Sequence, residues 1–143
     1  MNKMLYKYLP LALLVILLSA CSKKLTDTGC PTGQMCTMIY ATVTVPCVDA
    51  AGNPVQVKDV TVYNQRTNAP VVSQDIAGPD AVPDHVVLAT DGNKKQFSTT
   101  GDDIKVTAIN AVTNKIVTAT FKISGGCNCH VAKVAGPENI IFN

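Results

Sequence analysis

The sequence predicts an all-β domain, built as a sandwich of seven or eight short strands. Val, Thr and Ile recur in short runs that alternate with polar residues, and a period of two is typical of half-buried strands. After the first 20 residues, no stretch places apolar residues at helical spacing for three turns. Turn-forming residues separate the runs at intervals typical of a sandwich. We therefore expect strands and turns throughout the domain.

The first expected strand covers residues 37–48, and a turn at 49–54 connects it to a second strand at 55–63. Asp, Gly and Pro predict the turn because they suit tight reversals of the backbone. Pro46 has no N–H for the ladder, so it indicates an edge strand or a bulge. The inward face of the first strand is expected to hold Ile39, Ala41, Val43 and Val45.

The middle of the domain is expected to be less regular. Residues 64–70 form a polar loop in this prediction, and residues 71–72 begin a third strand. Gly and Pro make 76–83 an irregular loop. A short apolar strand at 85–90 follows, and a turn at 91–93 closes it.

The last third of the chain predicts a hairpin and two further strands. The hairpin has arms at 104–111 and 116–124 around a turn at 112–114. The two further strands cover 129–134 and 139–142. The inward positions of the second hairpin arm are Val117, Ala119, Phe121 and Ile123.

The first 21 residues have the parts of a cleavable secretory signal. Lys3 and Lys7 give a positive start, and the apolar run at 9–18 is shorter than the roughly 20 residues that a membrane-spanning helix needs. Residues 18–21 (LSAC) resemble the bacterial lipobox, whose cysteine is acylated. The resemblance implies lipidation at Cys21, for example with palmitate.

Cleavage before Cys21 would remove a lipoprotein signal peptide at 1–20 and leave 123 of the 143 residues, enough for one domain with a core. A small polar tether at 21–29 would then join the lipid to a β-sandwich domain at 30–143. Ser22 after the acylated cysteine favours the outer membrane, by analogy with known lipoprotein sorting. The expected partner is the lipid bilayer, through acylated Cys21.

The charge balance indicates no second partner. The formal net charge of +2 comes from 12 basic and 10 acidic side chains, and loss of Lys3 and Lys7 with the signal leaves ten of each. A neutral domain lacks the basic field that nucleic-acid binding needs. We therefore expect no nucleic-acid partner, while an envelope protein or a glycan stays open as a ligand.

The cysteines other than Cys21 are Cys30, Cys36, Cys47, Cys127 and Cys129. Disulfides are expected because an exported chain folds in an oxidising compartment. We favour a bond between Cys36 and Cys129 and another between Cys30 and Cys127, which would tie the two ends of the domain together. Cys47 continues the inward face of the first strand, so we expect a buried free thiol there.

A metal-binding or thiol-redox site is the alternative for the same cysteines, Cys30, Cys36, Cys127 and Cys129, with His130 as a further ligand. Thiolate and imidazole are suitable zinc ligands. Structural zinc sites prefer two to four residues between paired cysteines, whereas five residues and one residue separate these pairs. The favoured interpretation therefore needs no metal or cofactor.

Signals of enzymatic activity are weak. His85 and His130 lack the partner motifs of hydrolases and metalloenzymes. Turn chemistry explains the aspartates better than calcium binding does, since none lies in a calcium-loop motif; these are Asp80, Asp91, Asp102 and Asp103. Tyr40 and Tyr63 are a candidate stacking platform for a sugar, although packing between strands is the commoner role of such tyrosines.

Two segments resemble known domains. Residues 42–45 (TVTV) and 49–55 (DAAGNPV) look like the first strand and turn of carboxypeptidase regulatory-like and transthyretin-like domains. Residues 129–137 (CHVAKVAGP) are similar to the ending of small envelope lipoproteins of Bacteroidetes-type bacteria. The resemblance implies an Ig-like sandwich without a catalytic site. We therefore expect a lipid-anchored, non-enzymatic binding or structural module of the cell envelope.

Overall fold

The computed structural model describes residues 30–31, 33–72 and 83–143. Every strand of the described residues lies in the compact unit formed by residues 31–143. The expected signal peptide, Cys21, the tether and most of the expected loop at 76–83 lie outside the described residues.

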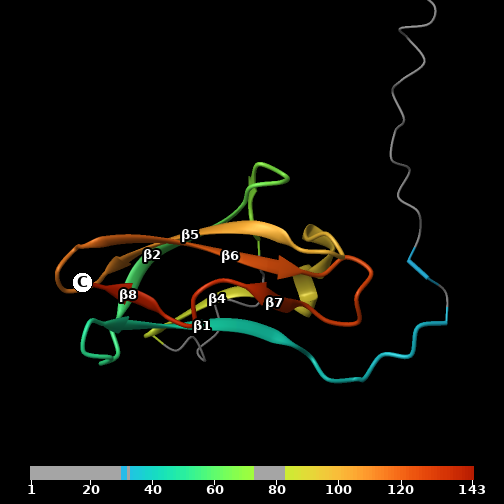
Figure 1. The fold of residues 1–143 in the computed structure, drawn as a ribbon, viewed down its shortest axis with the longest axis horizontal. Coiled ribbons are helices and arrows are strands. Elements are labelled where there is room, and N and C mark those ends of the chain that lie inside the picture. Colours follow the sequence, from blue (N-terminus) through green and yellow to red (C-terminus); the bar gives the residue numbers. More distant parts are fainter. Residues whose placement is uncertain (1–29, 32, 73–82) are drawn as a thin grey trace, which may run out of the picture. The chain divides into compact units, whose positions relative to one another are not determined.

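The described strands form two facing sheets, so the prediction of an all-β sandwich is confirmed (Figure 1). One sheet has three strands in the order β4-β1-β8, and the other has five in the order β3-β2-β5-β6-β7. The strands are β1 (Thr42–Asp49), β2 (Val57–Asn64), β3 (Ala69–Pro70), β4 (His85–Thr90), β5 (Asp102–Asn110), β6 (Ile116–Ser124), β7 (Ala132–Ala135) and β8 (Ile140–Phe142).

The core lies between the sheets and takes apolar side chains from both. Val45 and Leu88 come from the three-stranded sheet, and Ile104, Phe121 and Ile123 come from the five-stranded sheet. All five are at most 1% exposed. Burying a side chain of this kind contributes about 1.5–3 kcal/mol.

The hairpin of β5 and β6 matches its prediction closely. The two strands pair without interruption from Asp102 opposite Ile123 to Ile109 opposite Ile116. In the turn, the Asn110 side-chain oxygen accepts hydrogen bonds from two backbone N–H groups, each at 2.9 Å. A local pairing with its own turn chemistry needs little help from the rest of the chain.

The first strand is shorter than predicted. β1 begins at Thr42, and residues 33–41 form an irregular segment, here called the N-terminal arm. Ile39 was expected to face the core but is 71% exposed. The reason is that the N–H of Ala41 donates to the side chain of Asp91, so the ladder starts only after this residue.

The prediction that Pro46 marks an edge strand or a bulge is wrong. β1 lies between β4 and β8, and its one bulge lies between Val43 and Thr44. Pro46 occupies the position where the pairing with β4 ends, and the parallel pairing with β8 begins at Cys47. The ladder loses little there, because the next N–H, that of Cys47, donates to the carbonyl of Asp84 at 2.7 Å.

Three shorter predictions also need correction. The expected strand at 71–72 is replaced by β3, two residues earlier in the chain. The expected turn at 91–93 is the start of a 3₁₀ helix, η1 (Asp91–Gln96). β7 begins at Ala132 rather than at residue 129, because the preceding residues take part in side-chain bonds and a disulfide.

Candidate functional site

The cysteines near the two ends of the domain are oxidised. Cys36 and Cys129 form a disulfide with a Cα–Cα distance of 5.2 Å, as the sequence predicted. Cys30 and Cys127 are disulfide-bonded as well. The expected cross-link between Cys30 and Cys127 stays a prediction.

Oxidised sulfur removes the thiolates that a metal or thiol-redox site would use. The alternative of a metal centre at these cysteines therefore lacks its ligands in this state of the protein. Within the described ranges, no group of three or more metal-ligating side chains converges.

Cys47 is the free cysteine of the described residues, and it is fully buried. Burial, and secondarily the nearby charge of Asp84, raises its pKa to about 11. A thiol of this kind is packed as a small apolar side chain and is chemically unreactive. The prediction for Cys47 is confirmed.

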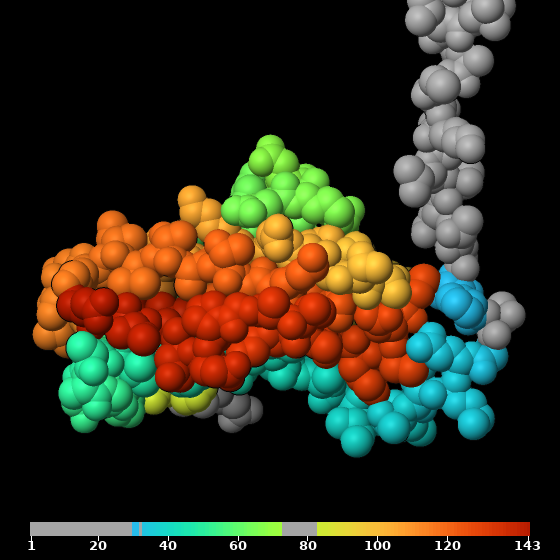
Figure 2. Space-filling view, in the orientation of Figure 1, coloured from blue at the N-terminus to red at the C-terminus, as the bar shows by residue number. Residues whose placement is uncertain are grey.

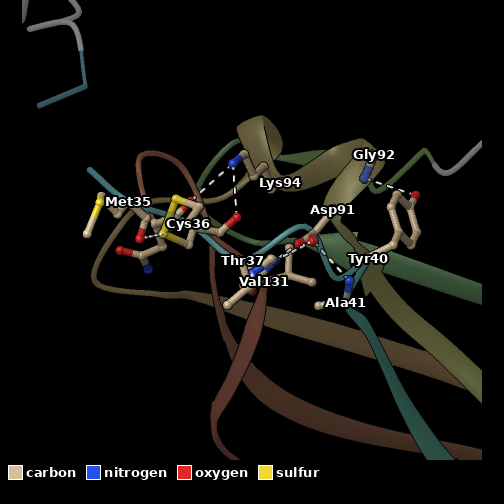
Figure 3. Close-up of polar contacts among 12 residues, drawn as sticks. Met35, Cys36, Thr37, Tyr40, Ala41, Asp91, Gly92, Lys94 and Val131 are labelled. Carbon is tan, nitrogen blue, oxygen red and sulfur yellow. Dashed lines mark hydrogen bonds and ion pairs between the residues drawn. A yellow bond between two sulfur atoms is a disulfide. The ribbon is translucent and has the colours of Figure 1, made fainter. Parts of the chain in front are cut away.

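Asp91, at the start of η1, connects three separate segments of the chain (Figure 3). One carboxylate oxygen accepts the N–H of Ala41 at 2.9 Å and lies 2.6 Å from Nδ1 of His130. The other oxygen accepts the N–H of Val131 at 2.9 Å. Burial acts to raise the pKa of Asp91, but these hydrogen bonds outweigh it and hold the pKa below its usual value.

His130 extends this arrangement to the N-terminal arm, because its Nε2 lies 2.7 Å from the hydroxyl oxygen of Thr37. An ionised carboxylate only accepts hydrogen bonds, so Nδ1 of His130 carries a proton toward Asp91. In the neutral ring, Nε2 then accepts the proton of the Thr37 hydroxyl. The five residues Thr37, Ala41, Asp91, His130 and Val131 are here called the Asp91 clamp.

Two further contacts fix the same region (Figure 3). The hydroxyl of Tyr40 accepts the N–H of Gly92 at 3.0 Å. The ammonium group of Lys94 donates to the carbonyl oxygens of Asn128 and Cys129, at 3.2 and 3.1 Å. Together with the Cys36–Cys129 disulfide, these bonds hold the N-terminal arm on the end of the domain.

A hydroxyl, an imidazole and a carboxylate in this order are the parts of a nucleophilic triad. In the Asp91 clamp, the same carboxylate also binds the backbone of Ala41 and Val131, which are 90 residues apart in the sequence. A structural role in fixing these segments accounts for every bond that Asp91 makes. The sequence concealed this cluster, because its side chains come from three distant segments.

A groove with a volume of about 790 Å³ lies beside β2 and β5 of the five-stranded sheet. Tyr63 and Lys105 pair across these strands, and both contribute to the groove. The segment after β2, which carries β3, stands above the sheet (green in Figure 2). The lining is Val60, Thr61, Val62, Tyr63, Gln65, Asn68, Pro70, Val71, Lys105 and Thr107.

Charge is sparse in this groove. Lys105 is the one ionisable group other than the phenol of Tyr63 among the lining residues, and no carboxylate is present. The Tyr63 hydroxyl donates to the side-chain oxygen of Asn68 at 2.9 Å, which fixes the ring beside the loop. The sequence indicated Tyr63 alone, because the folding of the loop over β2 is not visible in a linear pattern.

The two tyrosines considered as a sugar platform do not act together. Tyr40 lies in the N-terminal arm and contacts η1, whereas Tyr63 lies in β2 and contacts Asn68. His85 pairs with its neighbour Asp84 at 2.9 Å.

Asp102 is a buried member of a polar network rather than part of a turn. Its carboxylate contacts Nε of Arg66 at 2.6 Å, Nδ2 of Asn64 at 2.8 Å and the N–H of Ser98 at 3.1 Å. Burial alone would raise the pKa of Asp102, but the hydrogen bonds, chiefly that from Arg66, lower it to about 2. The network ties the end of β2 to the start of β5.

No protein-family model matches the chain, and no curated protein or solved structure matches it either. Among the described residues, no helix has the length and apolar character needed to cross a bilayer.

Proposed function

We propose that this protein is a lipid-anchored binding module of the cell envelope, most consistent with an outer-membrane lipoprotein without enzymatic activity. The groove beside β2 and β5 is the observation that supports a binding role. The lipobox-like residues 18–21 support the anchor. A sandwich held by disulfides suits an oxidising compartment outside the cytoplasm.

The lining of the groove favours a ligand that is neutral or anionic. Tyr63 offers an aromatic ring, and the amides of Gln65 and Asn68 offer both donors and acceptors. Lys105 adds a single positive charge, with no carboxylate in the lining to repel an anion. A sugar has an apolar face and many hydroxyls, so we propose a glycan ligand, with an acidic group placed near Lys105.

A glycan array probed with the lipidated protein tests this proposal. Binding to one class of glycans is expected, and Tyr63→Ala should abolish it. Lys105→Ala should weaken binding of acidic glycans and reduce its salt dependence. Lys95→Ala is the matched control, because Lys95 is exposed and outside the groove. Binding that tolerates Tyr63→Ala, or binding to peptides alone, would contradict the proposal.

The anchor has its own test. Replacement of Cys21 by Ala removes the thiol that accepts the lipid, so incorporation of labelled palmitate should fall to background. The wild-type protein should partition into the membrane fraction and carry the added acyl mass. Lipid still attached to Cys21→Ala would overturn this part of the proposal.

A second candidate function is hydrolysis, and the order Thr37, His130 and Asp91 is the observation that favours it. In this alternative, His130 takes the proton of Thr37 as the hydroxyl attacks an ester or amide carbonyl, and then gives it to the alcohol or amine that leaves as the carbonyl bond to it breaks. Water, deprotonated by His130, then hydrolyses the ester formed on Thr37. Turnover of ester substrates by the wild type and its loss in Thr37→Ala would support the enzyme. We expect neither variant nor wild type to turn over these substrates.

A further inference from the structure

The N-terminal arm combines a fixed backbone with unusually exposed apolar side chains. The Cys36–Cys129 disulfide and the contacts of Thr37, Tyr40 and Ala41 hold it against the domain. Yet three large side chains of this segment are highly exposed: Met35 at 96%, Met38 at 103% and Ile39 at 71%. In Figure 2, the arm (cyan) projects from the end of the domain.

Exposed apolar residues that are scattered singly need no explanation, but a contiguous group on a fixed segment indicates a contact surface. The composition of the segment agrees with a water-poor partner. No charged residue occurs between Asp27 and Asp49 in the sequence. An apolar, uncharged segment fits a bilayer surface better than it fits a polar protein partner.

The position of the arm relative to the lipid anchor identifies this partner. Met35 lies 14 positions after Cys21 in the sequence. A chain of this length spans at most about 45–50 Å even when it is fully extended. The turn between β5 and β6 lies at the opposite end of the domain from the arm (Figure 1). An anchor at Cys21 therefore keeps the arm within this distance of the membrane, whereas the hairpin end has no such short connection to the lipid.

We propose that Met35, Met38 and Ile39 insert into the interfacial layer of the membrane and thereby orient the domain on it. This inference rests on the proposed lipid anchor. Flexible Met side chains adapt to acyl chains. Segments of this kind enter the headgroup and upper acyl region to a depth of about 5–10 Å.

The absence of Trp from the chain allows a direct test. Met38→Trp places a single Trp at a fully exposed position of the arm, and Val112→Trp places one in the β5–β6 turn, at a position that is 83% exposed. Each lipidated full-length mature protein is reconstituted into vesicles of phosphatidylethanolamine and phosphatidylglycerol. Some of the lipid is replaced by phosphatidylcholine brominated near the top of its acyl chains.

The expected result is a blue-shifted emission for Met38→Trp and quenching several-fold stronger than for Val112→Trp. Equal and weak quenching of the two variants in lipidated protein would overturn the inference and leave the anchor intact. If the mass of the purified protein showed no attached acyl chains, both the proposed lipid anchor and this inference would be wrong. A blue shift without quenching, accompanied by cross-linked dimers, would show that a second copy covers the arm and would also overturn it.

Because the variants introduce a residue that itself prefers interfaces, a third protein checks the native side chains. Met35→Ser combined with Ile39→Ser, in the Met38→Trp background, should reduce the quenching toward that of Val112→Trp. Unchanged quenching in this protein would mean that the introduced Trp alone produces the signal, and it would contradict the proposal. Both substitutions affect exposed side chains, so the fold should persist.

Discussion

Asp102 is the buried carboxylate on which the end of β2 depends. Asn64, at this end, is itself buried, and its amide donates to Asp102 and to the carbonyl of Gln96. Arg66 covers the same carboxylate from the loop, with its own side chain half in solvent. A buried charge persists only when it is paired and hydrogen-bonded, and here the side chains of Asn64 and Arg66 meet that need together with the N–H of Ser98.

The first prediction concerns acid stability. The pKa of Asp102 is about 2 in the folded protein and 3.8 when unperturbed. The carboxylate therefore contributes stability fully above pH 4, and this contribution is lost as the pH falls through 2. Its size is roughly 2 kcal/mol. Denaturant unfolding at a series of pH values should show this loss, and Asp102→Asn should show much less of it.

Asp103 supplies the matched control for that experiment. It is the next residue in β5 but points outward and is exposed. Asp103→Asn should leave the free energy of unfolding within about 0.5 kcal/mol of wild type at neutral pH. If the two variants lost the same stability, the network around Asp102 would not be the source of the effect.

At the scale of elements, local sequence patterns predicted the strands that depend on local pairing. The hairpin of β5 and β6 was predicted well, with Phe121 and Ile123 buried as their alternation required. The start of β1 was predicted five residues too early, because the apolar side chains of the arm suggest a strand. Its first N–H partner is a carboxylate 50 residues away, which no local pattern reveals.

The candidate site was predictable only in part, because contacts between residues far apart in the sequence are not visible in local patterns. The bond between Cys36 and Cys129 could be predicted from chain order, since these cysteines lie on either side of the expected strands and a bond between them ties the two ends of the domain together. The Asp91 clamp depends on the folded positions of the arm, η1 and the segment before β7. The sequence indicated His130 only as a further ligand of the alternative metal site, whereas it bonds both to Asp91 and to Thr37.

The second prediction tests the clamp. Asp91→Asn keeps the size of the side chain but removes the charge that binds Ala41, His130 and Val131. The free energy of unfolding should fall by about 1–3 kcal/mol, because buried N–H groups lose a charged acceptor. Amide exchange of Ala41 and Val131 should increase, while exchange in the β5–β6 hairpin should change little.

Asp84→Asn is the control for the clamp, because Asp84 also pairs with a histidine but near the surface. We expect a change within about 0.5 kcal/mol for this variant. Comparable destabilisation by the two substitutions would indicate that Asp–His pairing in general, and not the joining of three segments, explains the effect.

At the scale of the whole molecule, the proposed ligand groove and the proposed membrane contact of the N-terminal arm belong to different sheets of the sandwich. The groove belongs to β2 and β5 of the five-stranded sheet, whereas the arm leads into β1 of the three-stranded sheet. An arm that inserts into the membrane therefore leaves the groove free for a ligand. The Cys36–Cys129 disulfide joins residues 93 apart in the sequence, so it fixes the arm to the last third of the chain.

The oxidation state of the whole molecule gives the last prediction. If Cys21 is acylated as proposed, it has no free thiol, and the four cysteines near the ends of the domain are in disulfides. Cys47 is then the one thiol left to react with a thiol reagent. Its burial and its pKa of about 11 should prevent reaction in the native state at pH 8. Denaturation without reductant should expose one thiol per chain, located by peptide mapping at Cys47. Five thiols with bound zinc under the same conditions would instead support the metal-binding alternative, since zinc holds cysteines as thiolates and not as disulfides.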